Sequence, residues 1–533
     1  MFSDETNRLL ARGSAISLGD VLETRVMVSP DWLALEYLGH DFTYKELNTL
    51  ANQCAWSLLD LGIRYGDAVV VLSENTLDYL SLIYGAAKTG VAVAGCNYRL
   101  AAPEVARSIS VIAPRYVFVC ASLEPLLRDA MPHYPSDIVA PEIIVWDKND
   151  FGGAKPALSR SLQNAKTHNP RIEVDPEEVL VIVYTSGTTG APKGAALSHR
   201  AIMARAGIMC AELHLTEHDN YVAWHPLFHM SCSDYVLITH VRGGKVFMTP
   251  RFDAHAIADF CVREKIGWLF LVPGVLDEVA DAIKASGKPV AGVKYVGCMA
   301  DLSPVHSLQN ITEVTGAGYF NTFGTTEVGT VPSAYGTLDL DHTPVSFRKV
   351  QSTFSRMRIV DPDGKDCPFG TPGEILYRTP TLFSGYWNND KATNETMRDG
   401  WYHSGDVCVL YEDGTYDFLG RSKYMIKSGG ESIYPAEVEH VLLKHPKISE
   451  VQVIRVPDEK WSEVPAAYIA THDGQAISVH ELNDFCAGHI TKWKVPKHYR
   501  FISTDDFPRN VTGKIERPLL EKMFAAEQLE ITS

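Results

Sequence analysis

The segment Tyr184–Gly194, with the sequence YTSGTTGAPKG, combines small hydroxyl residues, glycines and one lysine. Backbone N–H groups can turn inward in such a loop and Lys193 adds a mobile positive charge, so an oligophosphate is the expected ligand. An apolar run at 179–184 leads into the loop and favours phosphate binding over a flexible linker, the usual alternative for such a composition. The Walker pattern GxxxxGK[ST] fails, because Pro192 stands where its second glycine is required, and the pattern GxGxxG is absent.

The elements that must position this loop alternate between strand-like and helical patterns through residue 300. Thr43 and Glu46 have capping-box spacing, and Ser198 is a candidate cap for a helix over 201–212. Strands are expected at 68–72, 91–93, 116–120, 143–146, 179–184 and 268–272, and a further helix at 76–88. The alternation predicts an α/β domain with largely parallel sheets.

The pattern changes after residue 350. Turn signals at 361–364 and 412–414 predict antiparallel strands. Beyond Arg421 we expect a compact α+β unit with a helix from Pro435, a strand at 451–456, a helix at 479–487 and a strand at 499–502. Short polar connections place the domain boundary near residues 420–424.

Composition limits the classes of partner and compartment. The chain has 533 residues, enough for two or more domains, and 49 basic against 65 acidic residues give a net charge of −16. This charge argues against a nucleic acid or an anionic membrane surface as partner. Ten cysteines form no CxxC pair, so we expect neither zinc nor a disulfide framework. With no signal-peptide pattern, no integral membrane segment and no peroxisomal tripeptide in the sequence, we expect a cytoplasmic protein.

The sequence TSGTTGAPKG resembles the phosphate loop of the adenylate-forming superfamily, which includes acyl-CoA synthetases, aryl-CoA ligases, firefly luciferase and peptide-synthetase adenylation domains. Four further segments resemble that family's motifs in the family's order: NTFGTTE at 321–327, WYHSGD at 401–406, GRSKYMIKSGGE at 420–431 and PRNVTGKI at 508–515. Each alone has a simpler explanation, such as a common turn, a solvated basic turn or a surface lysine. Together they identify the chain as a member of this superfamily.

The resemblance implies a nucleotide site. It assigns Lys514 to charge neutralisation as an acyl-adenylate forms, Thr326 to a phosphate and Glu327 to a Mg²⁺ ion. Phe323 replaces the family's usual tyrosine and still permits stacking on adenine. The segment that begins at Gly297 differs from the GGA-type sequence that the family usually has there. The implied ATP- and AMP-binding residues are Thr185, Ser186, Gly187, Thr188, Thr189, Gly190, Lys193, Gly297, Cys298, Met299, Asn321, Thr322, Phe323, Gly324, Thr325, Asp406 and Arg421.

The resemblance also implies an acyl pocket and a mobile domain. His229, in the segment PLFH, would border the pocket, although a satisfied core histidine is an equal alternative. The expected pocket residues are His229, Met230, Ser231, Cys232, Val275, Cys298 and Phe320. This mostly apolar set contains no basic residue to pair a second carboxylate, so we expect an apolar monocarboxylic acid with a fatty, cyclic or aryl body. CoA would pass Lys427, Ser428, Gly429, Gly430 and Glu431.

The implied fold is a large N-terminal α/β domain over 1–421, with stacked sheets, flanking helices and a small β-rich subdomain. A smaller α+β domain over 424–533 would follow a hinge at 422–423, with Lys423 as the hinge residue.

The leading functional prediction is an ATP-dependent acyl-CoA ligase that uses Mg²⁺, forms acyl-AMP with release of pyrophosphate, and then transfers the acyl group to CoA by domain alternation. One alternative is an adenylating enzyme that loads a carrier protein or another acceptor, or a luciferase-like oxygenase. Another is a non-catalytic nucleotide-binding paralogue, against which the joint presence of Lys193, Glu327, Asp406, Arg421 and Lys514 argues. The expected partners are a small carboxylic acid, ATP and CoA. The sequence is compatible with a homodimer.

Overall fold

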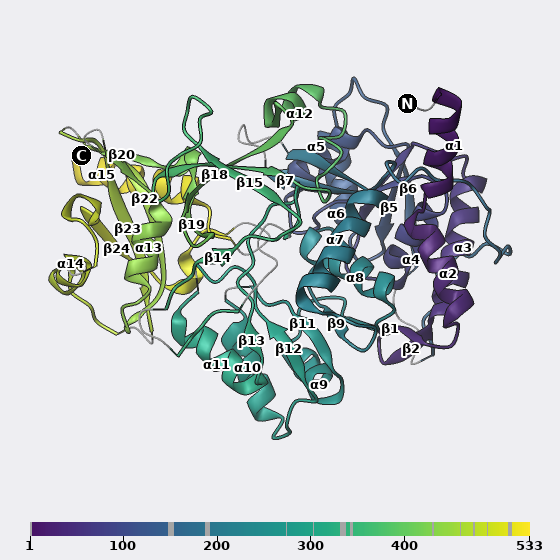
Figure 1. Cartoon of the computed structure of the whole chain (residues 1–533), viewed down its shortest axis with the longest axis horizontal. Coiled ribbons are helices and arrows are strands. Elements are labelled where there is room, and N and C mark those ends of the chain that lie inside the picture. Colours follow the sequence, from purple (N-terminus) through teal and green to yellow (C-terminus); the bar gives the residue numbers. More distant parts are fainter. Residues whose placement is uncertain are drawn as a thin grey trace.

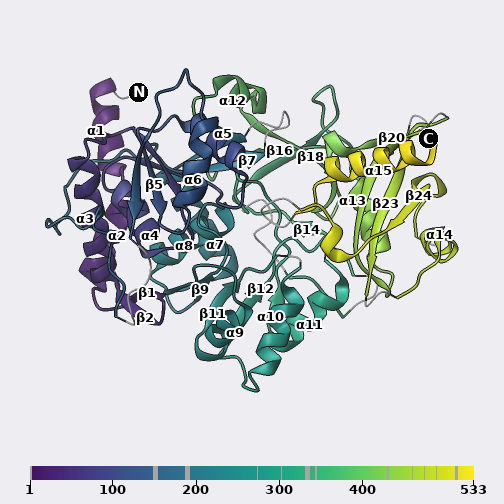
Figure 2. The same ribbon diagram turned by 180° about the vertical axis from the view of Figure 1, so that it is seen from behind.

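The computed structural model describes residues 3–147, 154–186, 192–272, 274–301, 303–330, 337–341, 345–428, 431–458, 460–472, 475–487, 489–509 and 514–532. Within these ranges the strands form four sheets. Figure 1 shows α1 to α8 on the right, the C-terminal elements from β20 onward on the left, β14, β15, β18 and β19 between them, and α9 to α11 below. The view from behind gives the same order, with α15 on the C-terminal part (Figure 2).

The first sheet has the order β6-β5-β3-β4-β7-β8, and every neighbouring pair is parallel except β7 with β8. Its strands are β3 (Ala68–Leu72), β4 (Ala92–Gly95), β5 (Tyr116–Cys120), β6 (Glu142–Trp146), β7 (Val179–Ser186) and β8 (Pro192–Ser198). In β3, Val69 and Val71 enter one hydrophobic cluster while Val70 and Leu72 enter another. Burial on both faces explains why β3 is an unbroken apolar run.

The second sheet has the order β13-β12-β11-β9-β10-β1-β2, in which only β1 and β2 are antiparallel. Its strands are β1 (Leu33–Tyr37), β2 (His40–Thr43), β9 (Asn220–Ala223), β10 (Val246–Met248), β11 (Ile266–Leu269), β12 (Val293–Val296) and β13 (Gly318–Tyr319). The prediction of largely parallel sheets is therefore confirmed.

Helices join the two sheets into one hydrophobic core. They are α1 (Asp4–Ser14), α2 (Leu18–Val28), α3 (Tyr44–Asp60), α4 (Leu77–Ala87), α5 (Ala102–Ile112), α6 (Glu124–Ala130), α7 (His199–Leu213), α8 (Met230–Arg242), α9 (Ala254–Arg263), α10 (Leu276–Ala285) and α11 (Val305–Thr315). Helix α4 lies against the first sheet, α8 lies against the second, and α2 contacts both helices. The predicted capping box is confirmed, because Thr43 accepts from the Glu46 amide and Glu46 accepts from the Thr43 amide.

A third, antiparallel sheet follows, with the order β14-β19-β18-β16-β15, and β17 pairs with β18. Its elements are β14 (Lys349–Val350), β15 (Arg356–Val360), β16 (Pro372–Arg378), α12 (Asp390–Thr396), β17 (Met397–Arg398), β18 (Trp401–Leu410) and β19 (Thr415–Arg421). The predicted turns contain Gly364 and Gly414, whose φ angles of 79° and 80° suit glycine. The change to antiparallel structure after residue 350 is thus confirmed.

The C-terminal part builds its own sheet, with the order β21-β20-β23-β22 and β24 beside β23. Its elements are β20 (Ile426–Ser428), β21 (Glu431–Ile433), α13 (Pro435–Leu442), β22 (Ile448–Asp458), β23 (Ser462–Thr471), α14 (Val479–Ala487), β24 (His498–Phe501) and α15 (Arg517–Thr532). Short 3-10 helices lie at Met131–His133, Ser422–Tyr424, Lys492–Lys494 and Thr504–Asp506. Two clusters of buried apolar residues fill this part, separate from the N-terminal core.

Two ring contacts join the C-terminal part to the rest of the chain. The ring of His440, on α13, lies 4.4 Å from that of Phe347 between centroids. The rings of His306, on α11, and His472 lie 4.7 Å apart. The ring planes meet at 61° for Phe347 and His440 and at 75° for His306 and His472, so these side chains pack edge to face.

Candidate functional site

The phosphate-loop segment connects two antiparallel strands. In the register of β7 and β8, Thr185 lies opposite Lys193. The predicted ligands Gly187, Thr188, Thr189 and Gly190, and the side chain of Ser186, lie outside the described residues. Strand β8, which lies between the loop and α7, was not predicted from the sequence. The predicted cap of α7 is confirmed, since Ser198 accepts from the Ala201 amide.

The segment 321–327 is largely buried and held by glycine geometry. A Cβ atom at Gly324 would lie 1.9 Å from the Gly329 carbonyl oxygen, so no other residue fits there without a shift of the backbone. Phe323 is buried, and its ring lies 5.0 Å from that of Phe418. Asn321 connects two neighbouring segments, because its Oδ1 accepts from the Ala300 amide at 2.9 Å and its Nδ2 donates to the Phe347 carbonyl at 2.9 Å.

Tyr386 connects Glu327 with the lysine of the phosphate loop. Its hydroxyl donates to Glu327 Oε1 at 2.7 Å, and the Lys193 ammonium lies 4.9 Å from the centroid of its ring. Burial raises the pKa of Tyr386, so the hydroxyl keeps its proton and remains a donor. Tyr386 was not predicted from the sequence, where it is one of several aromatic residues in the stretch TLFSGYWNND.

Asp406 and Arg421 face each other across β18 and β19. Arg421 Nε lies 2.6 Å from Asp406 Oδ1, but this contact is misaligned for a hydrogen bond, and no described residue donates one to that oxygen. Burial raises the pKa of Asp406 to about 6, and the nearby Arg421 opposes this rise. A buried carboxylate with an unsatisfied oxygen is suited to accept hydrogen bonds from hydroxyl groups.

Lys514 enters this site from the C-terminal part of the chain. Burial lowers the pKa of its ammonium, Arg421 lowers it further, and Cys298 and Asp406 raise it. The residue as a whole is exposed, and its charge lowers the pKa of His229. The tertiary structure therefore brings together residues from four distant segments. Residues 510–513, which precede Lys514, lie outside the described residues.

His229 belongs to a chain of hydrogen bonds that sequence analysis did not predict. Its Nδ1 accepts from the Ser231 amide at 3.1 Å, so this nitrogen carries no proton. Ser231 Oγ lies 2.6 Å from that nitrogen and must donate to it. The second contact of Ser231 Oγ, 2.7 Å from His225 Nδ1, must then be a bond donated by His225. Burial, followed by the charge of Lys514, lowers the pKa of His229 to about 3, so the ring is neutral.

The remaining predicted pocket residues lie at different depths. Met230, Cys232, Cys298 and Phe320 are buried, and Val275 is half-buried. Met299, predicted as a nucleotide-binding residue, is half-buried as well. Gly297 has a φ of 111°, and a Cβ there would lie 2.4 Å from the Tyr319 ring, so this position requires glycine. The segment therefore retains its first glycine although its sequence differs from the family's usual GGA type. Aromatic residues missed by the sequence analysis, among them Trp224 and Phe270, pack beside His225.

The predicted CoA route is only partly described. Lys427 and Ser428 lie on β20, where the Lys427 amide donates to the Glu463 carboxylate at 2.9 Å. Gly429, Gly430 and the side chain of Glu431 lie outside the described residues. Lys423 lies in the 3-10 helix Ser422–Tyr424, and its carbonyl accepts from Arg455 at 3.4 Å.

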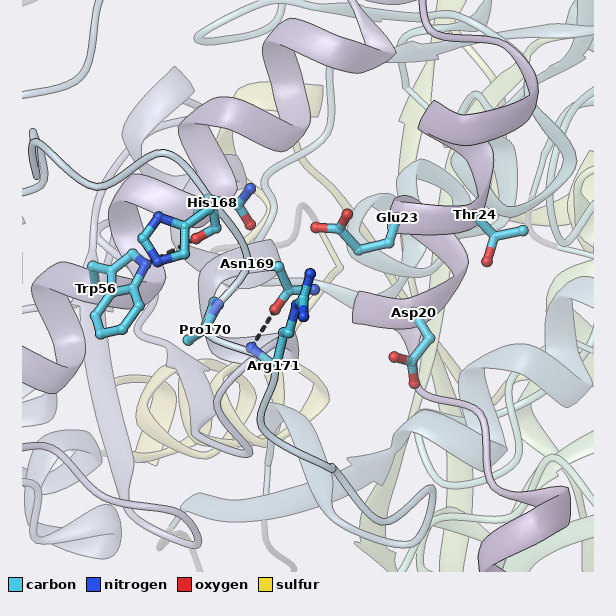
Figure 3. A pocket seen from close by; sticks show the side chains of 9 residues that line it. Asp20, Glu23, Thr24, Trp56, His168, Asn169, Pro170 and Arg171 are labelled. Carbon is cyan, nitrogen blue, oxygen red and sulfur yellow. Dashed lines mark hydrogen bonds between the residues drawn. The ribbon is translucent and has the colours of Figure 1, made fainter.

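A cavity of about 880 Å³ lies away from these residues. It is lined by α2, α3 and the segment 168–171, and Figure 3 shows Trp56 beside His168 on one side and Glu23 on the other. None of the predicted site residues lines it. In the described ranges no group of three or more His, Cys, Asp or Glu could hold a metal, and no helix there is long and apolar enough to cross a membrane.

The chain is similar to known proteins over most of its length. Residues 22–387 match the AMP-binding enzymes, and residues 437–514 match the C-terminal domain of AMP-binding enzymes. The chain is 31% identical to a long-chain-fatty-acid–CoA ligase, FadD13, of Mycobacterium tuberculosis, over 96% of this chain and 99% of that protein. It is 30% identical to a feruloyl-CoA synthase of Amycolatopsis, over 95% of this chain and 99% of that protein.

Solved structures agree on the fold. A Mycobacterium tuberculosis fatty acyl CoA synthetase aligns with a TM-score of 0.73 at 29% identity, over 96% of this chain and 99% of that one. The anthranilate CoA ligase AuaEII, in complex with anthranoyl-AMP, aligns with a TM-score of 0.83 at 24% identity, over 96% and 98% of the two chains. The chain therefore belongs to the family of AMP-binding enzymes, and its named relatives are acid–CoA ligases.

Proposed function

We propose that the protein is an ATP-dependent acyl-CoA ligase that activates an apolar monocarboxylic acid. The observation that carries this proposal is the meeting of Lys514 with Asp406, Arg421 and Cys298, residues far apart in the sequence. A cation inside a site that also offers a buried carboxylate suits the handling of an acid and a nucleotide together. The named relatives include ligases for a fatty acid and for an aryl acid, which agrees with an apolar acyl group.

Two observations support the fit of ATP and Mg²⁺. The Asp406 carboxylate, whose Oδ1 is paired with Arg421 but accepts no hydrogen bond from a described residue, would accept the ribose hydroxyls. Among the described residues, only Tyr386 donates to the Glu327 carboxylate, and only to Oε1, which leaves Oε2 available to a cation. One carboxylate combined with phosphate oxygens is the usual environment of Mg²⁺. When bound there, Mg²⁺ would neutralise phosphate charge.

In the first half-reaction, a carboxylate oxygen of the acid attacks the α-phosphorus of ATP, and the bond to pyrophosphate breaks. Lys514 would stabilise the charge on the carboxylate and α-phosphate oxygens. Lys193 and the phosphate loop would hold the departing pyrophosphate. His229, neutral and with its proton on Nε2, would offer a hydrogen bond rather than a charge to the acyl side of the site.

In the second half-reaction, the CoA thiol attacks the acyl carbon and AMP leaves. We propose that the C-terminal domain, 424–533, rotates about residues 422–423 to withdraw Lys514 and admit the thiol past Lys427 to Glu431. In support, the last strand of the third sheet ends at Arg421 and the first strand of the C-terminal sheet begins at Ile426. The N-terminal domain would then be residues 1–421.

The proposal has a direct test. A panel of fatty, cyclic and aryl monocarboxylic acids should be assayed for ATP–pyrophosphate exchange, and then for thioester formation with CoA. We expect at least one acid to support both. If no acid supports exchange, the proposed function is wrong, and exchange without thioester would indicate another acceptor.

We further propose that the enzyme acts in the cytoplasm. Size-exclusion chromatography with light scattering would distinguish a monomer from a homodimer.

A further inference from the structure

Arg205 is a buried arginine on α7 that sequence analysis did not single out. Only 1% of the surface of Arg205 is exposed, which is rare for a residue with a charged side chain. Its Nη1 donates to Asp234 Oδ2 at 2.6 Å, and Asp234 lies on α8, the helix that His229 caps. Among the described residues, Asp234 is the only acidic partner of Arg205 in an ion pair.

The rest of the guanidinium holds two backbone segments. Its Nη2 donates to the Thr326 carbonyl at 2.9 Å, directly before Glu327. Its Nε and Nη2 lie 3.3 Å and 3.2 Å from the Thr381 carbonyl, to which both donate. The planar guanidinium spreads five N–H donors over a fork, which lets it bind a carboxylate and two carbonyls that lie on different sides of it, whereas a lysine offers all its donors from one nitrogen atom.

The segment that carries Glu327 is fixed from its other side by the same neighbours. Thr381 Oγ1 donates to the Val328 carbonyl at 2.8 Å, and the Phe383 amide donates to the Glu327 carbonyl at 2.7 Å. At Gly329 the φ is 73°, and an added Cβ would lie 2.8 Å from Arg205 Nε. The backbone around Glu327 is therefore built closely around the guanidinium.

We propose that Arg205, paired with Asp234, is a positioning residue that fixes the backbone of Thr326 and Glu327 so that the Glu327 carboxylate meets the metal of the metal–nucleotide substrate. The inference rests on the proposed function, because it takes Glu327 as the Mg²⁺ ligand. It links α8, on the acyl side of the site, to the segment that handles phosphate.

The test compares nucleotide binding with and without metal, in the absence of any acid. Arg205→Lys keeps a positive charge for Asp234 but loses the fork that reaches the Thr326 carbonyl. Isothermal titration should show the Kd of MgATP raised about tenfold, the loss expected for one hydrogen bond made by a charged group. The Kd of ATP in EDTA should change by less than about twofold, since no metal is then involved.

A matched control separates this role from general stability. Glu36→Gln alters another largely buried carboxylate, which pairs with Lys245 and Arg263 away from this site. Its melting temperature should fall while the Kd of MgATP stays unchanged. In exchange assays Arg205→Lys should raise the KM for MgATP and leave the KM for the acid within about twofold.

Asp234→Asn gives a second perturbation that keeps an oxygen for Arg205 Nη1 and removes the charge. It should shift MgATP binding in the same direction, and it carries the test if Arg205→Lys does not fold. Equal weakening of MgATP and metal-free ATP, or unchanged binding of both in a folded variant, overturns the inference. If the wild-type protein binds neither form, the proposed function fails instead.

Discussion

Protonation of His440 should weaken the docking of the C-terminal domain. The His440 ring packs against Phe347, and no described residue hydrogen-bonds its buried Nε2. Burial lowers the pKa of His440 to about 4. Lys444 and Lys349 lower it further, whereas Asp417 raises it. A positive charge on this ring would have no acceptor at Nε2, so the docked domain favours the neutral form.

The sign and size of the effect follow from the two pKa values. A histidine exposed by domain separation titrates near pH 6.5. Its folded-state pKa is depressed, so this contribution to docking is fully present above about pH 6.5 and is lost as the pH falls towards about 4. The docking equilibrium should therefore weaken about 30-fold between pH 7.5 and pH 5, which is about 2 kcal/mol.

Hydrogen exchange followed by mass spectrometry can measure this loss. After correction for the intrinsic pH dependence of exchange, segments 345–350 and 435–444 should lose protection between pH 7.5 and pH 5. His440→Phe keeps the aromatic contact and removes the titrating nitrogen, so its loss should be smaller. His306, whose pKa is also lowered by burial and which packs against His472, should contribute to the remainder.

The control is His480→Phe, because His480 is exposed on α14 and pairs only with Asp484 among the described residues. This variant should behave like the wild-type protein. The reasoning is refuted if the wild-type protein and His440→Phe lose the same protection over this pH range.

Three further predictions concern chemistry and stability. Lys514→Ala should lower adenylation by about 10²- to 10³-fold while thioester formation from preformed acyl-adenylate is largely kept, and equal losses in the two steps would contradict the rotation of the domain. Glu327→Gln keeps an acceptor for Tyr386 but removes the charge, so the Mg²⁺ concentration for half-maximal exchange should rise about tenfold; an unchanged value would exclude Glu327 as the metal ligand. Leu442, with 0% exposure in the C-terminal core, should cost about 2 to 5 kcal/mol of stability when replaced by alanine, measured by urea unfolding, and a cost below about 1 kcal/mol would show that the site collapses without a cavity.

Local patterns were sufficient to predict many elements. The apolar run at 116–120 matches β5, and the helix predicted at 479–487 matches α14. Caps at Thr43 and Ser198 are local interactions between residues three apart, so they are visible in sequence. The strand expected at 268–272 instead spans Ile266–Leu269, an error at the boundary of a short apolar run.

The partners of the site residues were not predictable in this way. Tyr386 is 59 residues from Glu327, to which it donates. Arg205 holds the Thr326 carbonyl across 121 residues. From the sequence alone, an arginine within a helix is read equally well as a surface residue, and an aromatic residue in a loop equally well as an ordinary core residue, because these roles are more frequent. Only packing at long range distinguishes these roles.

The sequence by itself determined the family, the order of the elements and the kinds of side chain available to the site. These depend on local spacing and on short sequence motifs. The tertiary structure decided how those side chains act. It places Lys514 beside Asp406 and Arg421, holds Glu327 through Tyr386, and orders the protons of His225 and His229 through Ser231. Burial and distance set the charge and direction of each group, and both arise only when distant segments pack together.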